Sequence, residues 1–360
     1  PSDVHSLLLK GDKMITLALN PFNHAPLVLT IADFDALRIR YARTLHTQHA
    51  CIVAALSGSR LDVKDHCVPI EIATRDTATL QRPDTRRANK TLQGVAEVQG
   101  LSAWLQSSYA RRLGGDASEP ACVLLTAGPA EGKTCLMSQL VAFALDNEST
   151  TAMVPVLIKV QLLQRQLLIP ENRRVFANAW NWVDAYLQST LGADSEEYLM
   201  LRQALMARRA LILLDGLDEG GVARERVEKH VANVLAPQGH VILATSRPDG
   251  VKKGLFEEHF HRLKLCPLTE DQQAQVIKRR LLSHAAAKDL QRYLREKVPR
   301  DENDLPLTGN PLMLSMVCSI FESRRRESMP ENIAELYDVA TRSMLERVDR
   351  KERGASSESR

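Results

Sequence analysis

The sequence predicts an α/β domain built on a parallel sheet with flanking helices, followed by a small helical bundle. Short apolar runs alternate with helical segments through the middle of the chain, and this order is typical of parallel strands joined by right-handed crossovers. From Leu268 onward only helical patterns remain. The expected strands are residues 122–127, 153–160, 211–215, 241–245 and 262–266.

The first expected strand leads into a glycine-containing loop and then directly into a helix. The loop residues are Ala127, Gly128, Pro129, Ala130, Glu131, Gly132, Lys133 and Thr134, and Cys135 follows them. In this setting the N–H groups and the dipole at the helix start favour a phosphate. Lys133 would reach the β- and γ-phosphates, and the Thr134 hydroxyl would coordinate Mg²⁺. Ala127 replaces the first glycine of the pattern, which the backbone tolerates if its φ is negative.

The third expected strand ends in an acidic segment. Its apolar residues 211–214 predict a strand that is buried on both faces. Asp215 follows at the carboxyl end, where ligands of open α/β sheets bind, and is expected to be the second Mg²⁺ ligand. Asp218 or Glu219 would orient or deprotonate an attacking water, because Gly216 has no side chain. The motif position does not choose between these two carboxylates.

The fourth expected strand, residues 241–245, runs into Ser246, Arg247 and Pro248. Pro248 ends the strand, because proline cannot donate to a sheet ladder. The Arg247 guanidinium at this sheet edge would bind the γ-phosphate, since its planar fork matches phosphate oxygens. Arg247 is therefore expected to distinguish a triphosphate from a diphosphate.

Together, these motifs resemble the NACHT family of signal-transduction NTPases, a STAND class of P-loop NTPases related to the AAA+ ATPases. The loop at 127–134, the DGLDE of 215–219 and the TSRP of 245–248 carry the resemblance, which spans roughly residues 100–350. Gly309, Asn310 and Pro311 match the family's Gly-x-Pro element, so the resemblance places Pro311 among the nucleotide-binding residues. The departures are Ala127 for the first glycine and Cys135 for the usual second threonine.

The chain is expected to contain several parts. Residues 1–95 form an N-terminal α+β region of unknown role, with a helix over residues 33–57. Residues 96–268 form the P-loop NTPase (NACHT) domain, and residues 269–350 form the helical domain. The helices expected there are 269–282, 285–298, 311–324 and 332–347. Thr269, which is followed by two acidic residues, is expected to be the N-terminal cap of the first of them. Residues 351–360 are expected to be a disordered tail.

The amino-acid composition argues against several classes of binding partner. A net charge of +3 is too small to indicate a polyanionic partner, and an aromatic content of 4% argues against a base-stacking surface for nucleic acid. No apolar run approaches the ~20 residues that span a bilayer. The six cysteines show no CxxC spacing and are expected to be reduced. We therefore expect a cytoplasmic protein without direct nucleic-acid binding or a membrane span.

The expected function is a molecular switch that binds ATP or GTP with Mg²⁺. Slow hydrolysis to the diphosphate and phosphate would control domain packing, because the two nucleotide states differ in their contacts. The resemblance implies self-association and protein partners in signalling, through domains outside this chain. The alternative is a scaffold that binds ATP without hydrolysing it. A helicase or remodelling motor is disfavoured, since the sequence has no second P-loop.

Overall fold

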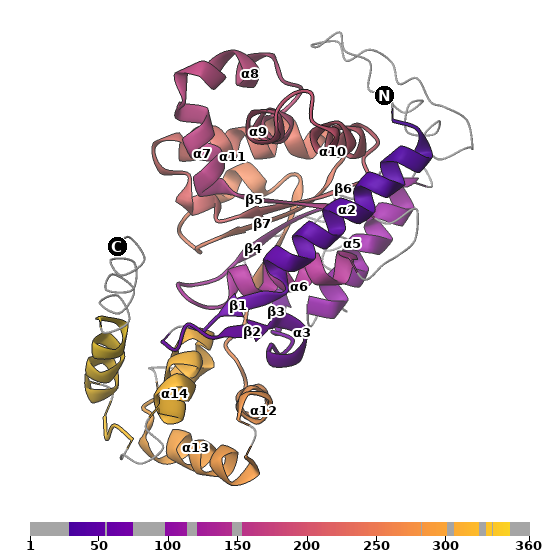
Figure 1. The fold of residues 1–360 in the computed structure, drawn as a ribbon. Helices are drawn as coiled ribbons and strands as arrows, with labels where there is room; N and C mark the ends of the chain where they lie inside the picture. The colour runs from indigo at the N-terminus through magenta and orange to yellow at the C-terminus, as the bar shows by residue number, and fades with distance from the viewer. Residues whose placement is uncertain are drawn as a thin grey trace, which may run out of the picture. The chain divides into compact units, whose positions relative to one another are not determined.

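The structure is a computed structural model that describes residues 29–54, 56–74, 98–113, 121–145, 153–281, 283–300, 306–323, 329–332 and 334–345 (Figure 1). These residues belong to two compact units. The first comprises Pro1–His49, Glu71–Pro129 and Leu136–Leu265, and the second comprises Ala50–Ile70, Ala130–Cys135 and Cys266–Arg360. The tail expected at residues 351–360 lies outside the described residues.

The first unit is built on a six-stranded sheet, which confirms the predicted α/β class. The strands lie in the order β3-β8-β4-β7-β6-β5, and every neighbouring pair is parallel except β3 and β8. The strand bounds are β3 Ile72–Thr74, β4 Cys122–Thr126, β5 Val154–Lys159, β6 Ala210–Asp215, β7 Val241–Ser246 and β8 Phe260–Leu265. The five parallel strands correspond to the five predicted ones, whereas β3 was not predicted.

The order of strands brings three chain segments to one edge of the sheet. Strand β7 lies between β4 and β6, with Thr126 of β4 paired to Ser246 and Leu214 of β6 paired to Ala244. Since all three strands are parallel, their carboxyl ends reach the same edge. The segments after β4, β6 and β7 are those in which the sequence predicts the phosphate loop, the metal carboxylate and the arginine.

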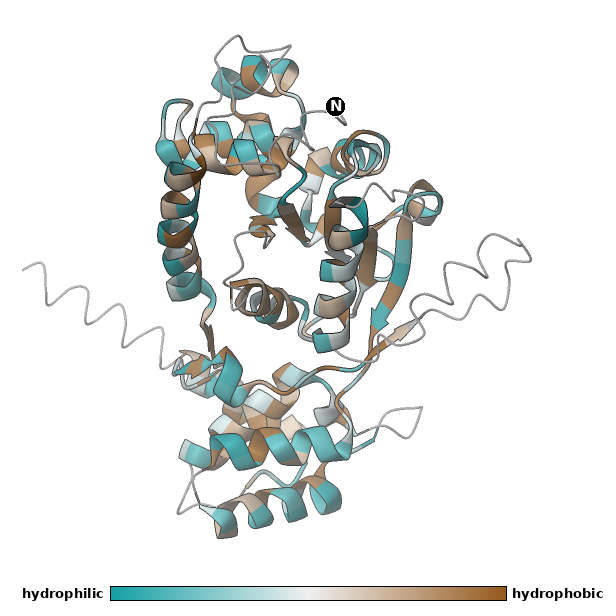
Figure 2. Ribbon diagram, turned by 90° about the vertical axis from the view of Figure 1, so that its right-hand side faces the viewer, coloured by the Kyte–Doolittle hydropathy of each residue, from teal (hydrophilic) through white to brown (hydrophobic). Residues whose placement is uncertain are grey.

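Helices cover the sheet of the first unit, and the central strands are buried on both faces. Every residue of β4 and β7 is buried, as a continuous apolar run predicts. The helices carry both hydrophobic and hydrophilic residues, as expected of helices with one packed face (Figure 2). The helices of this unit are α2 Ile31–His49, α5 Val98–Leu113, α6 Lys133–Leu145, α7 Val160–Leu168, α8 Arg173–Asn178, α9 Trp182–Leu191, α10 Glu196–Met206 and α11 Arg224–His230. The first three residues of α6 are assigned to the second unit.

The N-terminal part of the chain contributes to both units. Helix α2 packs in the first unit, where the Tyr41 hydroxyl donates to the carbonyl of Pro155 in β5 at 2.9 Å. It ends at His49, earlier than predicted, because the chain then forms the antiparallel pair β1 (Cys51–Val53) and β2 (Arg60–Asp62). This pair belongs to the second unit.

The second unit is mainly helical. It contains α3 Val63–His66, α12 Glu270–Arg280, α13 His284–Lys297 and α14 Pro311–Ser323, and residues 334–345 are also helical. Thr269 caps α12 through a capping box: its hydroxyl accepts from the Gln272 N–H, and the Gln272 side chain accepts from the Thr269 N–H. Among the described residues, no helix combines the length and the apolar content needed to cross a membrane.

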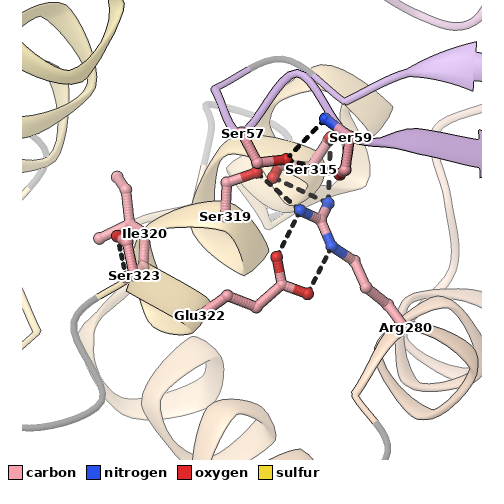
Figure 3. A network of polar contacts seen from close by, with 8 residues as sticks. All are labelled: Ser57, Ser59, Arg280, Ser315, Ser319, Ile320, Glu322 and Ser323. Carbon is pink, nitrogen blue, oxygen red and sulfur yellow. Dashed lines mark hydrogen bonds and ion pairs between the residues drawn. The ribbon is translucent and has the colours of Figure 1, made fainter. Parts of the chain in front are cut away.

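Arg280 joins α12 to α14 through a network of charge-assisted hydrogen bonds (Figure 3). Its guanidinium contacts both carboxylate oxygens of Glu322 at 3.0 and 2.8 Å, and it donates to the Ser319 hydroxyl at 2.7 Å. Two further bonds reach the carbonyl and hydroxyl of Ser315. Only 5% of the Arg280 side chain is exposed, so the network fixes α14, and with it Pro311 at the helix start.

Replacing Arg280 by methionine should lower the stability of the chain by about 2 kcal/mol, because several charge-assisted hydrogen bonds are lost. The cost is limited because the Glu322 side chain is 29% exposed and can be rehydrated. Urea denaturation would measure the change. The control is Arg292→Met in α13, since the Arg292–Asp289 pair is largely exposed and such pairs contribute little. Equal stability of the two variants would contradict the assigned role of Arg280.

Candidate functional site

The loop between β4 and α6 has the backbone geometry that the sequence requires. Ala127 is fully buried, and its N–H donates to the Ser246 carbonyl at 3.0 Å. Its φ is not positive, because the only non-glycine residues with positive φ in the described chain are Ala130, at +61°, and Arg208. Alanine therefore fits at position 127 without strain. Strain is instead placed at Ala130, since a left-handed φ is costly for a residue with a Cβ.

Gly132 sits in a crowded part of this loop. Its φ is +94°, and a Cβ built there would lie 3.0 Å from Cδ1 of Ile70 and 3.6 Å from Cγ of Pro311. The positive φ favours glycine at this position, and the contact with Ile70 leaves little room for a Cβ. Within the second unit, the loop is thus flanked by residue 70 of the N-terminal segment and by the first residue of α14.

The first turn of α6 carries the residues expected to bind phosphate and metal. Lys133 begins the helix, Thr134 is exposed, and Lys133 and Cys135 are half-buried. The N–H groups of a first helical turn have no acceptor within the helix itself, and helix N-termini therefore commonly bind anions. This turn is consequently a suitable place for a phosphate group.

Asp215 lies at the end of β6 and is held by the neighbouring strand. The Thr245 hydroxyl donates to Oδ1 of Asp215 at 2.9 Å and accepts from the Gly216 N–H at 3.0 Å. Asp215 is half-buried, whereas the rest of β6 is buried. Thr245 therefore orients the Asp215 carboxylate, a role for Thr245 that the sequence did not indicate.

Asp218 is engaged with Arg247. The Asp218 carboxylate forms an ion pair with Nε of Arg247 at 3.1 Å, and it also accepts from the Arg247 backbone N–H at 3.1 Å. The side chain of Asp218 is 10% exposed, while that of Arg247 is 56% exposed. Asp218 thus holds Arg247 in place through two of its groups, the Nε of the guanidinium and the backbone N–H.

Glu219 has a different environment from Asp218. It is exposed, and its side chain folds back over Gly216, with Cδ 3.0 Å from the position that a Gly216 Cβ would occupy. Gly216 has φ +79°, and its carbonyl accepts from the Glu219 N–H at 2.9 Å. This short turn returns the Glu219 carboxylate to the residue that follows Asp215. The missing side chain at position 216 is what makes room for it.

The described structure thus holds the predicted residues in two groups. Asp215, Asp218, Glu219 and Arg247 lie at the carboxyl edge of the sheet in the first unit. Gly132 and Pro311 lie side by side in the second unit. Among the residues described, no three His, Cys, Asp or Glu side chains gather closely enough to hold a metal by themselves. A metal bound by these residues would need oxygens of a ligand or of hydroxyl groups as well.

No protein-family model and no curated protein sequence matches this chain. Domain III of the replication initiation protein DnaA from Thermotoga maritima aligns with a TM-score of 0.38 and 12% identity, covering 65% of this chain and 90% of that one. A chain of the HORMA:CdnC:Trip13 complex of E. coli MS115-1 aligns with a TM-score of 0.39 and 14% identity, over 78% and 97%.

A third solved structure, PCH-2 of C. elegans, aligns with a TM-score of 0.33 and 13% identity, covering 70% of this chain and 68% of that one. These values are too low to identify a family or an activity. The α/β fold is established by the strand order itself, and the function has to be argued from the residues of the site.

Proposed function

We propose that this chain binds a nucleoside triphosphate with Mg²⁺ and acts as a nucleotide-operated switch with slow hydrolysis. One observation carries the proposal. The strand that leads into the loop before Lys133, the strand that ends in Asp215 and the strand that ends before Arg247 are parallel neighbours in one sheet. Their carboxyl ends reach the same edge of the sheet, and this shared edge supports a joint role for the loop after β4, for Asp215 and for Arg247.

In this proposal, the Thr134 hydroxyl and the Asp215 carboxylate are the protein ligands of Mg²⁺. Both supply oxygen, which hard cations prefer, and Mg²⁺ characteristically uses few protein ligands together with phosphate oxygens and waters. The hydrogen bond from Thr245 to Asp215 supports this role, because it orients the carboxylate at the carboxyl end of β6. ATP and GTP both satisfy these contacts.

Glu219 is the proposed base that orients or deprotonates the attacking water. Asp218 is committed to Arg247 by an ion pair and a backbone hydrogen bond. The Glu219 carboxylate is exposed beside Gly216, and it has no ion pair or hydrogen bond among the described residues. A general base needs a carboxylate that is available to water, and this requirement favours Glu219 over Asp218.

Arg247 is the proposed reader of the γ-phosphate. Asp218 holds Nε of its guanidinium, so the two terminal nitrogens at the exposed end remain for phosphate oxygens. A contact made only with the triphosphate supplies the differential binding energy that a switch needs. On the resemblance to NACHT NTPases, we extend the proposal to control of domain packing, self-association and signalling in the cytoplasm.

The Asp215→Asn variant tests the metal role. The amide keeps the shape and the contact with Thr245 but loses the negative charge that Mg²⁺ requires. We expect nucleotide binding to lose its dependence on Mg²⁺, while metal-free binding changes by less than about threefold. Titration of a fluorescent ATP analogue with Mg²⁺ and with EDTA would measure both. A Mg²⁺ response equal to that of the unmodified chain would exclude this role for Asp215.

The Arg247→Ala variant tests the switch. Its contact with the γ-phosphate should disappear, so the affinity for ATP should fall by about 1–3 kcal/mol while that for ADP stays nearly constant. Calorimetric titration with each nucleotide gives the two affinities. Equal losses for ATP and ADP would make Arg247 a structural residue. The alternative function, a scaffold that binds ATP without hydrolysing it, predicts that the unmodified chain releases no phosphate in a single-turnover assay with labelled ATP.

A further inference from the structure

Two cysteines that are distant in the sequence meet beside the phosphate-binding loop. The Cys135 thiol donates to Sγ of Cys67 at a sulfur–sulfur distance of 3.4 Å, across 68 residues of sequence. Cys67 follows directly after α3, and Cys135 lies in the first turn of α6, immediately after Thr134. Both side chains are half-buried, and both residues belong to the second unit.

We propose that Cys67 and Cys135 form a reversible dithiol–disulfide site, in which oxidation fastens the segment around Cys67 to the helix of the phosphate-binding loop. A disulfide requires a sulfur–sulfur distance of about 2.05 Å. The sulfurs therefore need to approach by about 1.4 Å, which is a small shift for side chains already in contact. None of the six cysteines forms a disulfide in this structure, so the pair is in its dithiol state.

The segment that carries Cys67 is also held in place by an N-terminal cap and by hydrogen bonds from α12. The N-terminus of α3 is capped by Asp62, whose carboxylate accepts from the N–H groups of Lys64 and Asp65. Arg279 of α12 donates to the Cys67 carbonyl, and the Gln272 side chain donates to the Pro69 carbonyl at 2.9 Å. A disulfide at Cys67 would therefore join the α6 turn to a fixed part of the second unit.

The same segment also contacts the loop at a second point. Ile70, three residues after Cys67, lies 3.0 Å from the position of a Gly132 Cβ. Two residues of this segment thus contact the loop: Cys67 contacts Cys135, and Ile70 lies next to Gly132. A covalent link here would restrain the turn that carries Lys133 and Thr134.

The oxidation needs a peroxide as its co-reactant, and the proposed oxidant is hydrogen peroxide. The Cys67 thiolate attacks one peroxide oxygen, the O–O bond breaks, and a sulfenic acid and water form. The Cys135 sulfur then attacks the Cys67 sulfur, the S–O bond breaks and a second water leaves. Two thiols and one peroxide thus give one disulfide and two waters, and a small dithiol reverses the reaction by exchange.

The hydrogen bond from Cys135 favours Cys67 as the first sulfur to react. This bond lowers the pKa of Cys67, although burial of the thiol and the nearby Asp62 oppose the effect. The buried thiols of Cys122 and Cys318 are different, because burial raises the pKa of each to about 12. The structure therefore separates the proposed pair from the inert thiols of the core.

Peptide mapping under non-reducing conditions tests the linkage in the folded chain. After brief treatment with hydrogen peroxide, we expect a linked peptide pair containing Cys67 and Cys135, with the mass lowered by two hydrogen atoms. Dithiothreitol should restore the free peptides. Cys67→Ser and Cys135→Ser should each abolish the product, whereas Cys51→Ser should keep it, since Cys51 is another half-buried cysteine of the second unit. The absence of this linked pair in the unmodified folded chain would overturn the proposal.

A second measurement tests the effect on the loop, and this part rests on the proposed nucleotide binding. A fluorescent ATP analogue should be released about tenfold more slowly from the oxidised chain, which corresponds to about 1.4 kcal/mol in the barrier. Cys67→Ser should release it at one rate with or without peroxide. A linked pair with unchanged release would overturn the control of the loop. A reduced chain that binds no nucleotide would instead overturn the proposed function and leave the mapped linkage intact.

Discussion

Lys133→Ala should weaken the binding of Mg²⁺ and ATP by roughly one to two decades. Lys133 is the first residue of α6, and its ammonium is the proposed point charge that binds the β- and γ-phosphates. Charge-assisted contacts of this kind contribute about 1.5–3 kcal/mol each. The loop N–H groups and the helix start remain in the variant, so binding should be weakened rather than abolished.

Titration with a fluorescent ATP analogue would measure this loss, with Lys288→Ala as the matched control. Lys288 is an exposed lysine of α13 and has no place in the proposed site. Both variants should unfold at the temperature of the unmodified chain, so that a change in affinity is not caused by unfolding. If Lys133→Ala and Lys288→Ala bind equally well, the loop does not hold the phosphates.

Glu219→Gln should lower the rate of hydrolysis by about 10²-fold or more, while nucleotide affinity is kept. The amide has the same shape but cannot accept the proton of the attacking water. Asp218→Asn should have a smaller effect on hydrolysis, because Asp218 acts on Arg247 rather than on water. It should instead weaken the preference for ATP over ADP, in the same direction as Arg247→Ala.

Single-turnover release of labelled phosphate would separate the two carboxylates, because it follows the chemical step and not product release. A larger loss for Asp218→Asn than for Glu219→Gln would reverse the assignment. If both variants hydrolyse ATP at the rate of the unmodified chain, neither carboxylate is the base. Hydrolysis that is absent even in the unmodified chain would favour the scaffold.

The central sheet could be predicted because its strands are short, continuous apolar runs. Such runs indicate strands buried on both faces, and the alternation with helices indicates parallel pairing. Strand β3 has only three residues at an edge of the sheet, and it gives no such run. The helix predicted over residues 33–57 extended too far, because the apolar residues after His49 fit a helical period as well as the strand β1 that they form.

The order of the site residues could be predicted from the motifs, but their contacts could not. Nothing in the spacing indicates that Thr245 holds Asp215 or that Asp218 pairs with Arg247, since the paired residues are 30 and 29 positions apart in the sequence. The choice between Asp218 and Glu219 depends on which side chain the turn after Gly216 leaves exposed. The contact of Cys67 with Cys135 likewise could not be predicted from the sequence, because it joins a predicted helix to a segment in which we identified no motif.

Hydrogen exchange of the backbone amides, with and without Mg²⁺ and ATP, tests the central claim most directly. We propose that three separate segments contribute to one nucleotide site: the loop 127–135, the acidic turn 215–219 and the arginine segment 245–248. We expect ATP to slow exchange in all three together, and ADP to slow it in the loop but less in the segment around Arg247. Exchange that ATP leaves unchanged in these segments, or slows only elsewhere in the chain, would contradict the account.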